Sequence, residues 1–485
     1  MDHRHAHAPA SGAHRLLSQL PVHIAGAALL VLLAALSPSP WWAAAAAFLG
    51  LAFTATLARA VPAALILLGP VIVLRLTELL SGVAIEGGAT MVETGVRGAA
   101  TGAFTRLWLI DLLAFASAAL LIEWGWRPLQ QRFASAGRAW RRQAGLIAVT
   151  LTLVLAGMSL ILAFFAITHG VPGGGRIDRF TYLNQLEGTP YRTIIMNRVL
   201  LAPLIGVVIA VPRTRWIGCA LLAWLIALSL LFAEKFTSLL FIGAAAIQPL
   251  ALVTLARTGA LPMRTLATAL LVLAAISLPA ILVTYGAADS PRRAWDRFEQ
   301  RAVLQGQLWF LADRRGAPRH IDAAALSADL GSWVDPRAQR PERAGTRFGL
   351  YYVMAKFTPS HRLEGAIQSE TGFVFAFYPY LLLAGGWTLL MLGALVVALF
   401  QATILLLVAQ ALYRCRWLAI LAFGRVANSI NATLVTGYAW NIFGPKTLVA
   451  AVLGIILLRI RPPFSSGIGS FRIESFILNK KITTR

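Results

Sequence analysis

The chain has 485 residues, of which 58% are hydrophobic and 13% are charged. Because soluble domains average about 25% charged residues, this composition excludes a soluble globular protein and is typical of a polytopic membrane protein. The net charge of +23 does not predict nucleic-acid binding, since no nucleic-acid-binding motif accompanies it and cytoplasmic loops of membrane proteins carry excess Arg and Lys.

Apolar segments long enough for membrane-spanning helices, about 20 residues each, recur along the chain. They lie at 20–37, 41–59, 61–82, 106–125, 144–168, 193–212, 215–233, 236–256, 264–285, 376–412, 417–436 and 444–460. The sequence therefore predicts an all-α fold with about twelve transmembrane helices. Segment 376–412 is too long for one upright helix, so we expect a tilted span preceded by a short interfacial helix.

The connections between these segments alternate in charge. One set is basic and nearly free of acids: the loop at 127–142, the turns at 213–215, 257–264 and 414–416, and the C-terminal tail. The positive-inside rule places this set, and both termini, in the cytoplasm. The other set includes 83–105, 169–192 and the 87-residue segment 286–372. We therefore expect spans 1–9 in 1–285, a large periplasmic loop at 286–372, spans 10–12 in 373–465, and a cytoplasmic tail at 466–485.

Ionisable residues at membrane depth are costly and often functional. Arg75 and Glu78 are three residues apart, so they are expected to pair on one helix face, and Asp111 and Glu123 lie in the fourth span. Glu234 and Lys235 lie at the predicted outer end of the seventh span. They form either a polar hairpin between two spans or a site in which Glu234 acts as a base and Lys235 binds substrate.

The predicted outer loop 169–192 combines glycines with arginines. Gly173–Gly175 precede Arg176 and Arg179, and Arg192 closes the loop, with Arg198 in the following span. A glycine run lets the backbone approach a ligand, and guanidinium groups suit phosphate or carboxylate. The segment is either a flexible loop or an anion-binding site.

The large loop opens with a four-residue repeat. Arg293, Arg297, Arg301 and Gln305, continued by Trp309, would form one stripe on a helix. This stripe is either a solvated or lipid-binding face, or a site for a polyanionic, pyrophosphate-bearing substrate.

The same loop closes with candidate bases. A neutral imidazole at His361 can take a proton from a sugar hydroxyl. A carboxylate at Glu370 can do the same if its pKa is raised. Each is otherwise a solvated loop side chain.

Four segments and the topology together resemble the Wzy-type O-antigen polymerases. The segments are the run Arg176–Asn197, the Glu234–Phe236 hairpin, the Arg301–Trp309 helix and the Glu370–Pro379 segment. The resemblance implies a metal-independent, GT-C-like transferase without a cofactor, at the periplasmic face of the bacterial inner membrane. Such an enzyme polymerises undecaprenyl-pyrophosphate-linked oligosaccharide repeat units in contact with membrane lipid, alongside a chain-length regulator and a flippase. It implies substrate-binding roles for Arg176, Arg179, Arg192, Arg198 and Arg301, and leaves the base open among Glu234, His361 and Glu370.

Two other functions stay open. An O-antigen ligase has a similar topology and uses the same donor, and differs mainly in its acceptor. A polysaccharide transporter or flippase would carry more charged residues deep within its spans. A metal-dependent lipid-linked glycosyltransferase is disfavoured, because the first outer connection, Ser37–Trp42, has no acidic residue.

Overall fold

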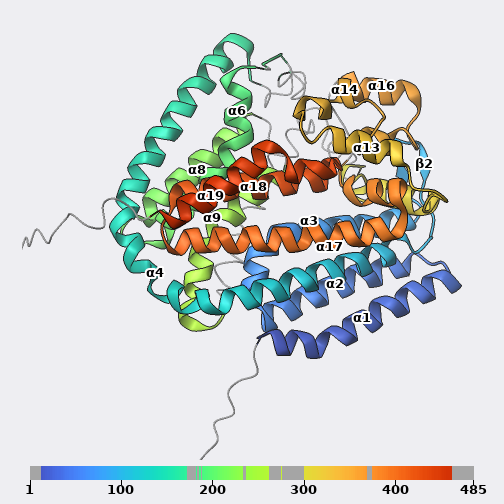
Figure 1. The fold of residues 1–485 in the computed structure, drawn as a ribbon, viewed down its shortest axis with the longest axis horizontal. Coiled ribbons are helices and arrows are strands. Elements are labelled where there is room, and N and C mark those ends of the chain that lie inside the picture. The colour runs from blue at the N-terminus through green and yellow to red at the C-terminus, as the bar shows by residue number, and fades with distance from the viewer. Residues whose placement is uncertain are drawn as a thin grey trace, which may run out of the picture.

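The computed structural model describes residues 12–171, 182, 185–186, 188–232, 236–261, 275, 300–368 and 374–460. Helices dominate this part of the chain and form one bundle (Figure 1). Within the described residues the only strands are β1 (Thr90–Met91) and β2 (Val96–Arg97), which pair as an antiparallel hairpin. Apart from that hairpin, the regular structure of the described residues is all helical, which agrees with the predicted all-α fold.

Ten segments of the described chain are helical, long and apolar enough to cross a membrane. They are α1 (Gly12–Leu36), α2 (Trp41–Ala60), α3 (Pro62–Glu86), the two halves of α4 (Ala103–His169), Pro190–Ala210, most of α9 (Phe236–Thr258), α17 (Phe377–Tyr413), α18 (Trp417–Thr436) and Ala439–Arg459. The chain thus has the helices of a polytopic membrane protein. The seventh predicted span corresponds to the shorter apolar helix α8 (Arg215–Leu231). The ninth, 264–285, lies outside the described residues except for residue 275.

Proline and glycine mark several helix ends. Pro62 opens α3, Pro190 opens α6 (Pro190–Asn197) and Pro445 opens α19 (Pro445–Arg459); in a first turn the N–H that proline lacks has no helical partner in any case. Gly437, with a φ of 72°, ends α18 in the left-handed conformation. The sixth span is interrupted, because the 3-10 turn η2 (Arg198–Leu201) separates α6 from α7 (Ala202–Ala210).

Helix α4 corrects one expectation. The basic segment 127–142, predicted as a loop between two spans, is helical, and α4 runs through it for 67 residues. The segment is rich in Arg, Gln and Ala, which are good helix formers, and the helix runs through Pro128 and Gly137 without ending. The two halves of α4 run in different directions in Figure 1, so one helix still supplies two spans.

The basic connections gather at one end of the bundle, here called the basic end. Trp140 Nε1 donates to the Leu412 carbonyl at 2.9 Å. Arg414 Nη1 donates to the Leu458 carbonyl at 3.1 Å. Segments far apart in the sequence therefore meet at this end, as the alternating charge pattern predicts. Which side of the membrane the basic end faces stays a prediction.

Residues 300–368 cover the opposite end, here called the loop end (yellow and orange, right side of Figure 1). They fold into short helices: α12 (Gln307–Arg315), α13 (Ala323–Gly331), η3 (Pro336–Gln339), α14 (Pro341–Ala344), α15 (Gly349–Met354) and α16 (Ser360–Gln368). Helix α12 packs on α3, α4 and α17. The described part of the large loop is therefore a compact cap on the bundle.

Helix α17 is divided at Gly386, which has a φ of 74°. The sequence predicted such a division from the length of the segment. The first part, Phe377–Gly385, is buried from Phe377 to Ala384, so it lies between the cap and the bundle. An interfacial helix would expose one face, whereas a helix that is apolar all round is expected to be buried.

Candidate functional site

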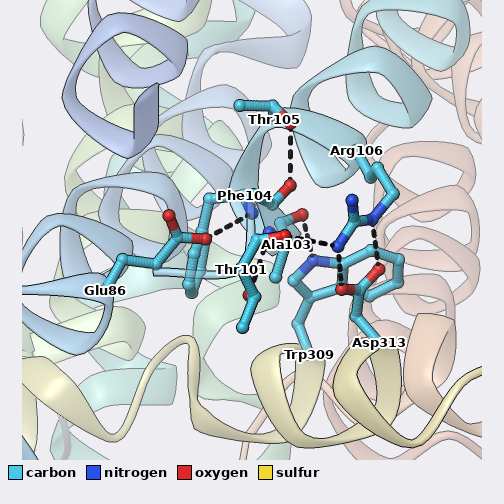
Figure 2. Close-up of polar contacts among 9 residues, drawn as sticks. Glu86, Thr101, Ala103, Phe104, Thr105, Arg106, Trp309 and Asp313 are labelled. Atoms are coloured by element: carbon cyan, nitrogen blue, oxygen red, sulfur yellow. Dashed lines mark hydrogen bonds and ion pairs between the residues drawn. The ribbon is translucent and has the colours of Figure 1, made fainter. Parts of the chain in front are cut away.

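A set of polar contacts fixes the cap to the start of α4 (Figure 2). The Arg106 guanidinium donates through Nε to Asp313 Oδ1 at 2.7 Å and through Nη2 to Asp313 Oδ2 at 2.5 Å. Trp309 Nε1 donates to the Ala103 carbonyl at 2.8 Å, and Trp309 is fully buried. Glu86 Oε1 accepts from the backbone N–H of Phe104, where the helix N-terminus favours a negative charge. We call the bidentate ion pair and the tryptophan contact the clasp.

The clasp holds the cap in place beside a polar cavity at the loop end. This cavity has a volume of about 400 Å³, within the range of about 300–1,000 Å³ that small-molecule sites occupy. Its polar lining consists of Arg315, His320, Asp322, Tyr352 and Lys356. Leu383, from the buried first part of α17, forms its apolar wall. We call this cavity the cap pocket.

Hydrogen bonds and cation–π contacts order the cap pocket. Arg315 Nη1 donates to the Lys356 carbonyl at 3.3 Å. Lys356 Nζ lies 4.6 Å from the centre of the Tyr352 ring, within cation–π range. Tyr352 donates its hydroxyl to Asp322 Oδ2 at 2.8 Å. Tyr352 therefore links the Asp322 carboxylate to the Lys356 ammonium, and the side chains of Arg315 and Lys356 are exposed.

The ionisation states in the cap pocket follow from these contacts. The backbone N–H of Ala325, the hydroxyl of Tyr352 and the nearby Lys356 hold the pKa of Asp322 below its usual value. Burial, together with the hydrogen bond to Asp322, raises the pKa of Tyr352. At neutral pH the pocket thus contains a carboxylate at Asp322 and a neutral phenol at Tyr352, and the exposed basic side chains of Arg315 and Lys356 also line it. This arrangement suits a polar ligand that carries negative charge.

A second polar cluster lies inside the bundle. Arg75 Nη1 pairs with Glu78 Oε2 at 2.5 Å, which confirms the predicted helix-face pair. Arg75 Nε lies 3.7 Å from Asp111 Oδ1, and its guanidinium stacks 4.0 Å from the centre of the Tyr378 ring. All four side chains are buried. Their arrangement ties α3, α4 and α17 together, so a structural role accounts for them.

The structure describes two members of the predicted outer arginine site, Arg192 and Arg198, whose role in binding substrate stays a prediction. Tyr191 packs edge-to-face on Phe165 and on Phe232, with ring centres 5.7 and 5.6 Å apart. This holds the segment that carries Arg192 against the end of α8. Arg198 is buried, and its Nε donates to Ser229 Oγ on α8 at 2.9 Å. The predicted residues Arg176, Arg179, Glu234 and Lys235 lie outside the described residues, and their roles stay predictions.

The predicted stripe is broken. Arg301 is exposed and Gln305 is half-buried, with Gln305 Nε2 bonded to the Arg301 carbonyl at 3.2 Å. A turn at 304–306 then separates them from α12, where Trp309 is buried in the clasp. The extension of the stripe to Trp309 is therefore wrong, because residues 304–306 interrupt the helix. The remaining members, Arg293 and Arg297, lie outside the described residues.

The candidate bases are not gathered in the cap pocket. His361 is exposed on α16 and is not among the pocket-lining residues, while Glu370 lies outside the described residues. The sequence reading missed Arg315, Asp322 and Tyr352. Their signal was weak: isolated polar residues at irregular spacing, brought together by tertiary folding.

Metal ligation finds no support in the described part of the chain, which holds no group of three or more His, Cys, Asp or Glu side chains able to bind an ion. Residues 343–451 match a protein family described as a family of unknown function (DUF6418). This region contains three cap-pocket residues, Tyr352, Lys356 and Leu383, and all of α17 and α18. Neither the curated proteins nor the solved structures contain a match to the chain.

Proposed function

We propose that the protein is a membrane glycosyltransferase that joins lipid-linked oligosaccharide units, with undecaprenyl pyrophosphate as the leaving group, at the outer face of a bacterial inner membrane. The observation that carries this proposal is the cap pocket. It combines two basic side chains with a carboxylate and lies at the end of the bundle opposite the basic connections. A lipid-linked donor has its sugar in water and its chain in the bilayer, so its reacting bond lies at such an end.

Charge stabilisation is the central requirement of this reaction. The acceptor hydroxyl attacks the anomeric carbon of the donor, a glycosidic C–O bond forms, and the bond from that carbon to the pyrophosphate oxygen breaks. The electron pair leaves with the pyrophosphate, whose negative charge grows in the transition state. Arg315 and Lys356 would stabilise that charge, because preorganised cations act most strongly where charge develops.

The acceptor proton needs a base. His320 lines the cap pocket, and a neutral imidazole can accept the proton of a sugar hydroxyl near neutral pH. Asp322 is a weaker base, because its pKa is lowered. Its fixed carboxylate is better suited to accept a hydrogen bond from a second sugar hydroxyl. Glu234, His361 and Glu370 remain the alternatives that the sequence predicts.

The ladder of surface polysaccharide from cells that lack the gene tests the proposal. Loss of long chains with retention of single-repeat species supports a polymerase. Loss of the single-repeat species as well indicates a ligase or an earlier step. An unchanged ladder contradicts the proposal and favours transport or an unrelated glycan.

Complementation with point variants tests the site. Lys356→Ala and Arg315→Ala should each shorten the ladder strongly, and His320→Gln should abolish long chains. Arg319→Ala is the matched control, because Arg319 is an exposed arginine in the same loop that does not line the cavity. Normal ladders from the pocket variants, at normal protein levels, would rule out the cap pocket as the active site.

A further inference from the structure

Arg425 lies near the middle of the membrane span α18. It is eight residues from the start of the helix and eleven from its end, which is roughly 12 Å and 16 Å at 1.5 Å per residue. A charge at this depth is costly and usually marks a site. No carboxylate among the described residues pairs with Arg425. Its guanidinium donates from Nη1 to Asn197 Oδ1 at 3.1 Å.

The neighbouring elements are built around this arginine. Asn197 ends α6, directly before the 3-10 turn η2, and such a turn within a span often marks a functional position. Gly424 lets η2 approach α18 closely, since a Cβ there would lie 3.3 Å from a Leu200 methyl group. The Asn197 side chain is itself held by a bond from Nδ2 to the Thr193 carbonyl at 2.8 Å. The guanidinium is thus positioned by two elements.

A second donor lies one turn away on the same face of α18. Asn428 is half-buried, and its amide has no hydrogen-bond partner in the part of the chain that the structure describes. Residues three apart on a helix are neighbours, so the Asn428 amide and the free N–H groups of Arg425 face a common space. A guanidinium has five N–H donors, and Asn197 takes one. The remaining donors at this depth match an anion with several oxygens.

We propose that Arg425, Asn428 and Asn197 form a binding site for the phosphate group of a membrane lipid, at mid-depth between η2 and α18. The lipid chain would lie in the bilayer, and guanidinium groups bind phosphate oxygens through paired hydrogen bonds. The site is separate from the cap pocket and does not depend on the function proposed for it.

Binding of short-chain phosphatidic acid to the purified full-length protein in non-ionic detergent tests this site. Arg425→Gln should weaken binding at least tenfold, and Arg425→Lys should bind more tightly than Arg425→Gln but more weakly than the wild type, because an ammonium keeps the charge and lacks the planar fork. Asn197→Asp keeps the arginine but places a carboxylate beside it, so this variant should also weaken binding at least tenfold. Arg459→Gln, at an exposed arginine that ends α19, should bind as the wild type does.

Two comparisons identify the ligand class. Diacylglycerol of the same chain length should not bind with comparable affinity, because it lacks the phosphate. Inorganic phosphate should bind at least a hundredfold more weakly, because it lacks the chain. Equal binding of diacylglycerol, or of inorganic phosphate, would overturn the proposal. Wild-type affinity in both Arg425→Gln and Asn197→Asp would also overturn it. If Arg425→Gln does not fold, the affinity of Asn197→Asp alone decides the test.

Discussion

The clasp between Arg106 and Asp313 allows a quantitative test of how the cap is attached. Replacing Asp313 with Ala removes both hydrogen bonds of a bidentate ion pair. Breaking a fully buried pair costs about 3–5 kcal/mol. The Asp313 side chain is 1% exposed but that of Arg106 is 26% exposed, so the stranded guanidinium can reach water. We therefore expect a smaller cost of about 2 kcal/mol.

The free energy in question is that of cap detachment. A cost of about 2 kcal/mol raises the population of the detached cap about 30-fold. Pulse proteolysis of the purified protein in detergent measures this population through the cleavage rate within 300–368. Trp309 and its bond to the Ala103 carbonyl remain in the variant, so the cap should loosen without coming away entirely.

A double-mutant cycle separates the ion pair from other effects. Arg106→Ala, Asp313→Ala and the double variant should give a coupling free energy of about 1–3 kcal/mol. Arg301→Ala is the matched control, because Arg301 is exposed and forms no ion pair among the described residues. A coupling below about 0.5 kcal/mol would refute the reasoning, since the two side chains would then act independently.

Three further predictions concern stability. Burial raises the pKa of Asp329 from 3.8 to about 7, so the native state binds this proton more tightly than the unfolded state does. The free energy of unfolding should therefore fall as pH rises from about 4 to about 7. Denaturant titrations should show this fall in the wild type and its loss in Asp329→Asn. Gly349→Ala should destabilise by about 2 kcal/mol or more, because φ is 67° and the new Cβ would clash with the Tyr438 ring. Thermal unfolding should show no such loss in Gly365→Ala, where the Cβ meets open space. Arg75→Met leaves Glu78 without its cation inside the bundle and should cost about 3–5 kcal/mol, measured by the yield of folded protein after mild heating; wild-type thermal stability in this variant would show that the pair is not needed.

Sequence reasoning predicted the features that depend on local chemistry. Apolar length predicted about twelve spans, and ten of them are helices long and apolar enough to cross a membrane in the part of the chain that the structure describes. Three-residue spacing identified the pair of Arg75 and Glu78, because hydrophobicity and helical period are read directly along the chain. The basic segment in α4 was wrongly predicted to be a loop. Its charges indicate that the chain leaves the membrane there, but charged residues do not end a helix. The helix through Gln305 was extended too far for a similar reason, because periodicity does not show where a helix ends.

The cap pocket lay beyond such reasoning. Arg315, Asp322 and Tyr352 come from three short elements whose contacts depend on how the cap folds. Their nearest sequence signal, Asp322 before the helical run at 323–331, indicates only a helix cap. The predicted arginines could be found because they cluster in the sequence, whereas the pocket cations cluster only in space.

The division of α17 at Gly386 affects which substitutions the contact between cap and bundle can tolerate during evolution. Two carbonyl groups freed near the break accept bonds from the cap: Ala384 from the Asp322 backbone N–H at 2.8 Å, and Leu383 from the Tyr352 hydroxyl at 3.4 Å. Carbonyl groups are the same in every residue, so substitutions along this stretch leave the acceptors in place. The bond between Asp322 and Ala384 joins two backbone groups, so this contact between cap and bundle tolerates divergence in side chains, provided that position 386 keeps a residue able to adopt its left-handed backbone. The bond to Leu383 and the clasp, in contrast, each need their side-chain donors. Homologous chains would then preserve the geometry of this joint long after their sequences cease to look alike.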